Sequence, residues 1–149
     1  MEKERFIKAM ATLGEEFRKA AENNKIMAFG ESIQDDILVN AMQEAHQYNP
    51  WFIPPFVTYA FQAWANALEE EKIIKWLKAY DFSGVLKRMP KTVGVVMAGN
   101  IPMVGLHDLL CVLASGNTAL VKLSGSDDKL IPAITRFMAK LDPEIGERV

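Results

Sequence analysis

The segment that most constrains the fold is residues 93–124, VGVVMAGNIPMVGLHDLLCVLASGNTALVKLS. It holds two short apolar runs, VGVVMA and TALVKL, on either side of an apolar segment of helical length. Valine-rich runs of this kind are typical of parallel strands that are covered on both faces. Because parallel strands need a crossover connection, 103–114 is predicted to be a helix with Pro102 in its first turn. A last helix, with Pro132 in its first turn, is predicted after 124–128, so the order of elements indicates a doubly wound α/β fold.

Four apolar stripes at helical spacing precede this segment. They are Phe6, Met10, Leu13 and Phe17; Ile33, Ile37, Ala41 and Ala45; Val57, Phe61, Trp64 and Leu68; and Ile73, Leu77 and Tyr80. The second helix is predicted to begin at Ser32, with Asp35 as a weak capping-box variant, and to stop at Asn49 and Pro50. The front of the chain is therefore predicted to be a series of amphipathic helices.

PWFIPP, residues 50–55, is predicted to form an extended elbow, because each proline disfavours helix in the residue before it. Residues 1–89 are expected to form a mainly helical region, and 90–149 the first βαβα portion of an α/β domain. Two strands do not make a stable sheet, so we expect the chain to be the front portion of a longer protein. The alternative is that the missing strands come from a second copy that pairs at the exposed edges.

Charge and cysteine content bear on partners and compartment. In the 149 residues, 17 Lys and Arg face 19 Asp and Glu, and no long block of either sign occurs, so nucleic acid is not an expected partner. One cysteine rules out an internal disulfide, and two histidines leave little for a structural zinc site. These counts fit a reducing cytoplasm. No apolar run approaches the roughly 18 residues of a membrane span, and no secretory signal opens the chain.

Common nucleotide-binding motifs are absent from the glycine-rich segment. Gly94 and Gly99 match the spacing of a P-loop, but Asn100 and Ile101 stand where lysine and Ser or Thr should follow. The dinucleotide fingerprint G-x-G-x-x-G is missing as well. Asn100 instead follows a predicted buried strand, at the edge where ligands bind in open α/β sheets, and its amide is suited to donate to a developing oxyanion. The alternative is that Asn100 caps the following helix.

The segment GNIPMVGLHDLLCVLASGNTALVKLS, residues 99–124, resembles the Asn-x-Pro helix and the Gly-Asn-Thr/Ala-x-x-x-Lys strand of the aldehyde dehydrogenase superfamily. The stretches NPWFIPPFV and PKTVGVVMAGNIP, and VKLS in place of lysine-proline-serine, are most similar to LuxC-type acyl-CoA reductases. The resemblance extends over residues 49–141. It implies a Rossmann-like parallel sheet of aldehyde dehydrogenase type, of which 90–149 is the first part of the cofactor-binding domain.

The resemblance also implies a reaction and its residues. Enzymes of this kind reduce a fatty acyl-CoA thioester to an aldehyde and are expected to be homo-oligomers. Asn100 is similar to the asparagine that stabilises the oxyanion, and Lys122 and Ser124 are expected to bind the cofactor, with the Lys122 ammonium at the adenosine ribose. Because 124–126 hold no acidic residue, NADPH is favoured and NAD is left open. The catalytic cysteine of these reductases lies on a later domain, so this chain alone is expected to be inactive.

His107 and Cys111 stand four residues apart on the predicted helix, which allows an imidazole beside a thiol. Apolar neighbours and the lack of a third orienting group favour a buried, structural cysteine instead. The methionine-rich and tryptophan-rich stripes are likewise expected to belong to the core and not to a ligand site. A second hypothesis for the whole chain is a non-catalytic binding or assembly module that docks a partner reductase or associates with itself.

Overall fold

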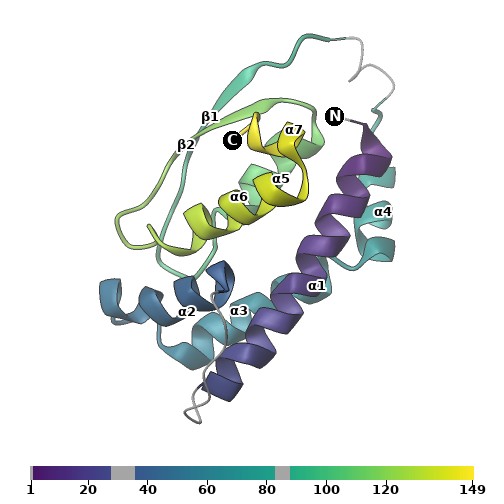
Figure 1. Ribbon diagram of the computed structural model, residues 1–149. Helices are drawn as coiled ribbons and strands as arrows, with labels where there is room; N and C mark the ends of the chain where they lie inside the picture. Colours follow the sequence, from purple (N-terminus) through teal and green to yellow (C-terminus); the bar gives the residue numbers. More distant parts are fainter. Residues whose placement is uncertain (1, 28–35, 83–87) are drawn as a thin grey trace.

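The computed structural model describes residues 2–27, 36–82 and 88–149, which form a mostly helical α/β structure with a small parallel sheet (Figure 1). The elements in chain order are α1 (Lys3–Met27), α2 (Ile37–Tyr48), α3 (Pro54–Ala67), α4 (Glu70–Lys78), β1 (Thr92–Val96), α5 (Leu106–Ala114), β2 (Thr118–Lys122), α6 (Leu130–Leu141) and α7 (Pro143–Gly146). The α/β class and the strand, helix, strand, helix order are confirmed. None of the helices in the described ranges combines the length and apolar character needed to cross a membrane.

The long helix α1 is the centre of the helical part. Its predicted stripe is buried, and α1 packs mainly along α3 (Figure 1). The rings of Phe17 and Phe61 meet edge to face with centroids 4.9 Å apart, which joins the two stripes. Arg5, at the start of α1, pairs with the carboxylates of Asp142 and Glu144 around the start of α7. The first and last helices are thereby held together.

Two helix starts differ from the sequence prediction. Asp36 caps α2 by accepting from the backbone N–H groups of Leu38 and Val39, whereas Ser32, Ile33 and Asp35 lie outside the described residues. Helix α3 begins with the proline pair of PWFIPP, so the elbow covers only residues 50–53. Proline suits the first turn of a helix, where its missing N–H would have no partner. Tyr80 was predicted to be buried, but it follows α4 and is exposed.

Within the described residues the sheet is covered on one face only, whereas the strand pattern predicted cover on both faces inside a larger sheet. Strands β1 and β2 pair in parallel, with Gly94 opposite Leu120 and Val96 opposite Lys122. Side chains at these positions share a face, on which Val96 is 77% and Leu120 is 67% exposed. Figure 1 shows α5, α6 and α7 together on one side of the strands. An apolar strand pattern predicts two apolar faces but does not say what covers each of them.

Candidate functional site

The candidate site lies at the carboxyl ends of the two strands. The ends are held in register by the bond that Met97 N–H donates to the Lys122 carbonyl, at 3.0 Å. After β1 the chain passes through a run of turns at residues 100–105, and after β2 it passes through the loop 123–129. In open α/β sheets this is the edge where ligands bind. The structure therefore brings Asn100 and Ser124, which sequence reasoning selected separately, to the same edge.

Asn100 does not cap a helix. Helix α5 begins at Leu106, later than predicted, and its N-cap is Gly105, which offers no side-chain bond. The side chain of Asn100 is exposed and lines a cavity of about 440 Å³. The other lining residues come from the elbow, from α3 and from the turn itself: Trp51, Phe52, Phe56, Tyr59, Ala60, Ala63, Trp64, Ile101 and Pro102. The helix-cap alternative is wrong, and the oxyanion role of Asn100 stays a prediction.

The cavity wall is aromatic, and much of it faces solvent. Trp51 is 81% exposed and Tyr59 is 72% exposed, while Phe52 beneath them is buried. Trp51 lies in the elbow, outside the apolar stripes that were predicted to form the core. Exposed aromatic side chains at the mouth of an apolar cavity are typical of a site for an apolar ligand. Sequence reasoning missed this wall because the elbow and Asn100 lie about 50 positions apart in the chain and meet only in the fold.

Two contacts fix the turn after β1 against the loop after β2, and a third joins that loop to the end of α2. The backbone N–H of Met103 donates to Asp127 Oδ2 at 2.8 Å. At Gly99, any β-carbon would collide with the side chain of Ser124, so only glycine allows this approach. Asn49, at the end of α2, donates from Nδ2 to the Ser126 carbonyl at 3.0 Å. The site is thus assembled from three segments that are distant in the sequence.

Asp127 is the most unusual group at this edge. Its residue is 4% exposed, and its Oδ1 atom has no hydrogen-bond partner within the described part of the chain. Burial raises the pKa of the carboxyl to about 6, against the opposing effects of the bonds from the backbone N–H groups of Met103 and Leu130. Met103, in turn, has a φ of 60°, the left-handed region that residues other than glycine rarely adopt. No motif in the sequence marked either residue.

Lys122 and Ser124 occupy different environments. Lys122 lies on the open face of the sheet, beside Val96, and its side chain is exposed. Ser124 is half-buried, and its Oγ accepts from Ser126 N–H at 3.2 Å. A cation at the edge of an open apolar strand face fits the ribose end of a dinucleotide, and a hydroxyl that still has a proton to donate fits the same role. The residues present therefore suit part of NADPH, and both assignments stay predictions.

His107 and Cys111 are neighbours on α5, as the sequence spacing required. The Cys111 sulfur lies 3.8 Å from each ring nitrogen of His107. Burial raises the pKa of the Cys111 thiol, and the negative charge of Asp108 raises it further. Cys111 lines another cavity, of about 380 Å³, together with Trp76 and Tyr80. Cys111 is only half-buried, so the prediction of a buried cysteine is wrong, but the raised pKa keeps its thiol protonated near neutral pH, as expected of an unreactive cysteine.

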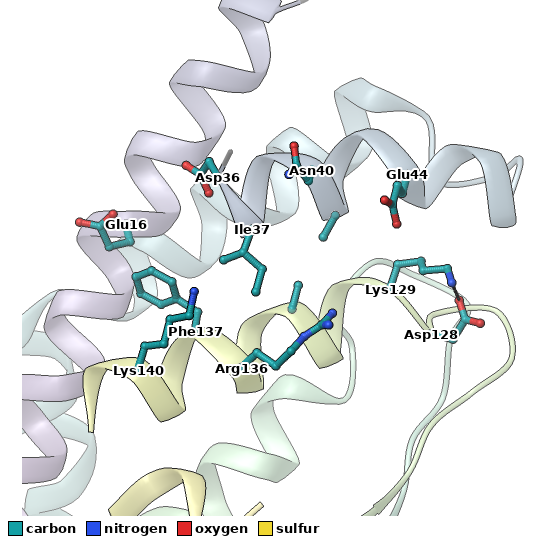
Figure 2. A pocket seen from close by; sticks show the side chains of 12 residues that line it. Glu16, Asp36, Ile37, Asn40, Glu44, Asp128, Lys129, Arg136, Phe137 and Lys140 are labelled. Carbon is teal, nitrogen blue, oxygen red and sulfur yellow. Dashed lines mark ion pairs between the residues drawn. The ribbon is translucent and has the colours of Figure 1, made fainter. Parts of the chain in front are cut away.

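A further cavity, of about 690 Å³, lies between α1, α2 and α6 (Figure 2). Acidic side chains on α1 and α2 face basic ones on α6, and Lys129 pairs with Asp128 at 4.0 Å. Lys129 also lies over the Tyr48 ring, 3.8 Å from its centroid. This cavity is lined largely by charged side chains, unlike the apolar cavity beside Asn100. Its acidic and basic side chains largely offset one another, so it offers no strong excess charge to an ionic ligand.

The parallel strands of this α/β unit end beside an apolar cavity and an exposed amide, at the edge where ligands bind in open α/β sheets. A model of the LuxC acyl-CoA reductase family matches residues 60–149, which contain Asn100, Lys122 and Ser124. The chain therefore belongs to the LuxC family of acyl-CoA reductases. Comparison with curated proteins found no match, and comparison with solved structures found none either.

Proposed function

We propose that this chain supplies the acyl-binding and oxyanion-stabilising part of an enzyme that reduces a fatty acyl-CoA thioester to an aldehyde with NADPH. The observation that carries the proposal is the apolar cavity that opens beside the Asn100 side chain. Membership of the LuxC family supports the reaction class. The overall reaction consumes acyl-CoA, NADPH and a proton, and it gives aldehyde, CoA and NADP⁺.

In this proposal the aromatic wall takes the acyl chain out of water, with Trp51 and Tyr59 at the mouth of the cavity. The thioester carbonyl then lies near Asn100, whose Nδ2 group donates to the carbonyl oxygen as negative charge develops there. A donor that is already in place stabilises this charge without reorganisation in the transition state. Asn100 is therefore assigned to the chemical step and the cavity to substrate binding.

The proposal assigns Lys122 and Ser124 to the cofactor, within a doubly wound sheet of aldehyde dehydrogenase type. NADPH, when bound, supplies the hydride. The exposed ammonium of Lys122 favours a hydroxyl-rich ribose and a 2′-phosphate, since residues 124–126 carry no acidic side chain that would repel it. A cytoplasmic location is part of the same proposal, because a free thiol persists in a reducing compartment.

We further propose that the thiol that accepts the acyl group comes from outside these 149 residues. Cys111 is the only cysteine of the chain, and its pKa is raised by burial. The purified chain, mixed with dodecanoyl-CoA and NADPH, should therefore show no loss of NADPH absorbance and no acyl adduct by mass spectrometry. Rapid stoichiometric acylation at Cys111 would contradict the proposal.

The test of acyl binding uses the tryptophans of the cavity as reporters. Trp51 and Trp64 line it, whereas Trp76 lines another cavity. Dodecanoyl-CoA should quench the fluorescence of the chain at a concentration at least roughly a hundredfold lower than acetyl-CoA. Each buried methylene contributes about 0.8 kcal/mol, so four of them already give this ratio. Replacing Trp76 with Phe should leave the quenching unchanged.

Two matched alanine substitutions on α3 locate the binding. Ala63 lines the cavity and Ala67 does not, although both are exposed. Ala63→Phe should fill the cavity and weaken dodecanoyl-CoA binding at least tenfold, whereas Ala67→Phe should leave it within twofold. Equal affinity for acetyl-CoA and dodecanoyl-CoA, or equal effects of the two substitutions, would show that the cavity does not hold an acyl chain.

The second hypothesis, an assembly module, has one observation in its favour. Val96 and Leu120 form an exposed apolar strip on the open face of the sheet, the kind of surface that a partner covers. Under this hypothesis Leu120→Ser would abolish association, and dodecanoyl-CoA would bind no better than acetyl-CoA. The chain-length comparison therefore separates the two functions.

A further inference from the structure

We propose that Asp127 is a positioning residue for the reduction: its carboxylate holds the turn at residues 100–103 in the conformation that presents Asn100 to the thioester. The inference rests on the proposed function, because it assigns a support to the oxyanion donor. Asp127 itself is buried and does not line the cavity beside Asn100.

The turn adopts a conformation that local sequence does not favour. Met103 has a φ of 60° and a fully buried side chain. A non-glycine residue remains in this region only where its surroundings enforce it, and such residues concentrate at functional sites. The enforcing contact is visible: the Met103 N–H donates to Asp127 Oδ2 at 2.8 Å. Without this acceptor, a buried N–H would be left without a partner in a strained turn.

The carboxylate at this position is bonded to the backbone but is still unfavourably buried. The N–H groups of Met103 and Leu130 both lower the pKa of the Asp127 carboxyl, yet burial outweighs them and raises it to about 6. The acceptor nevertheless lies where the Met103 N–H requires it. The buried Asp127 carboxyl lowers stability but fixes one backbone conformation beside a candidate catalytic side chain. This is what is expected of a positioning residue.

The turn is also held on its other side. Gly99, the residue before Asn100, packs so closely against Ser124 that it leaves no room for a β-carbon. The backbone is therefore fixed immediately before Asn100 and three positions after it. Between these two contacts the Asn100 side chain reaches the apolar cavity. Loss of the Asp127 acceptor should free one end of this segment and let the amide leave its place.

The test is a double-mutant cycle in the active reductase that contains this chain. Asp127→Ala should lower kcat at least tenfold and change KM for acyl-CoA by less than threefold, because the cavity is untouched. In an Asn100→Ala background, the same substitution should lower kcat by no more than twofold, because the group that it positions is already gone. Effects of the two substitutions that simply multiply would overturn the proposal.

Two conservative variants keep the test decisive if Asp127→Ala does not fold. Asp127→Asn keeps an acceptor in the same place and removes the charge, so kcat should stay within threefold of the parent. Asp127→Glu keeps the charge and displaces the acceptor, so kcat should fall at least tenfold. The reverse order of these two variants would show that charge, not position, matters.

Asp142→Ala is the matched control, because Asp142 is also buried and accepts a backbone N–H, from Glu144. This variant should leave kcat within twofold of the parent.

Amide hydrogen exchange in the purified chain reports on the contact without any enzyme assay. The Met103 N–H should be protected in the parent and in Asp127→Asn, and exchange at least a hundredfold faster in Asp127→Glu. Unchanged Met103 protection in Asp127→Glu would overturn the positioning role. If Asn100→Ala leaves kcat unchanged, the proposed function fails, and the exchange result still shows whether Asp127 holds the turn.

Discussion

The helical region, α1 to α4, differs from the region β1 to α7 in how completely its apolar side chains are buried and its polar groups are paired. In the helical region the predicted stripes close on one another, and Leu13, Phe17 and Phe61 are fully buried. In the second region an apolar strand face stays exposed within the described residues, and Met103 and Asp127 are held in unfavourable states. The first region behaves as a scaffold, and the second carries the features that folding alone does not explain.

The family match divides the chain in a similar way. It begins within α3, includes all of the second region and leaves out α1 and α2. Yet the elbow and the start of α3, which precede the match, supply Trp51 and Tyr59 to the cavity. The helical region thus contributes packing and most of the cavity wall, while the proposed chemistry lies at the sheet edge. Substitutions in the two regions should therefore differ in kind.

The largest effect on stability is expected in the scaffold. Phe61→Ala removes a buried ring that contacts Phe17, so the free energy of unfolding should fall by about 3–5 kcal/mol in urea titrations. Phe56→Ala, on the same helix but 57% exposed, should cost less than about 1 kcal/mol. Equal losses for the two variants would remove the distinction between the buried and exposed faces of α3.

The next largest effect is on turnover. Asn100→Ala in the active reductase should lower kcat by roughly a hundredfold or more, which corresponds to about 2.7 kcal/mol of transition-state stabilisation. The melting temperature should be unchanged, because Asn100 is exposed and caps no helix. A lower melting temperature with unaltered kcat would show that Asn100 serves stability and not catalysis, so the two regions would not differ in the way described.

A smaller effect, of opposite sign, is expected at Asp127. Its pKa in the fold is about 6, above the ordinary 3.8, because burial disfavours the charged form and Asp128 adds repulsion. The fold therefore binds this proton more tightly than the unfolded chain does, and the stabilisation present below pH 4 is lost as the pH rises through 6. Asp127→Asn should raise the free energy of unfolding by about 2 kcal/mol at pH 7 and change it little at pH 4. Urea titrations at the two pH values measure it, and an equal shift at both would refute the buried-charge explanation.

The smallest effect is expected at Lys122. Lys122→Met keeps the length of the stem and removes the charge, so NADPH should bind the active reductase about fivefold more weakly, or about 1 kcal/mol, since solvent screens an exposed ammonium. Cofactor fluorescence titration measures this change. Lys91→Met, another exposed lysine before β1, should have no effect. Identical affinities of the parent and Lys122→Met would leave Lys122 as a surface residue of the strand.

Local patterns predicted the scaffold well. The spacing of Phe6, Met10, Leu13 and Phe17 predicted a buried helical face, and all four side chains are buried. The two valine-rich and leucine-rich runs predicted β1 and β2 because a short apolar run bounded by glycine and polar residues has few other solutions. The predicted helix boundaries were less accurate. Helix α5 begins at Leu106 and not at Met103, because the Met103 N–H donates to Asp127 and the chain turns before the helix begins.

The site was only half predictable, for a physical reason. Asn100 and Ser124 follow predicted strands, and the carboxyl ends of parallel strands meet at one edge, so their proximity could be inferred. The aromatic wall and the bond from Met103 to Asp127 depend on packing between segments far apart in the chain, which periodicity does not encode. The exposure of Val96 and Leu120 was not predicted for the same reason. A strand's sequence shows that both of its faces are apolar, but it does not show which elements pack on each face.

The central claim is that an acyl chain lies in the cavity beside Asn100, and photo-crosslinking tests it most directly. Dodecanoyl-CoA carrying a diazirine at the end of its chain, irradiated with the purified protein and analysed by peptide mass spectrometry, should label residues 51–64 and 100–102. Unlabelled dodecanoyl-CoA should suppress the labelling, and Ala63→Phe should abolish it, whereas Ala67→Phe should not. Labelling concentrated on the charged cavity between α2 and α6, or spread over the surface without competition, would contradict the account.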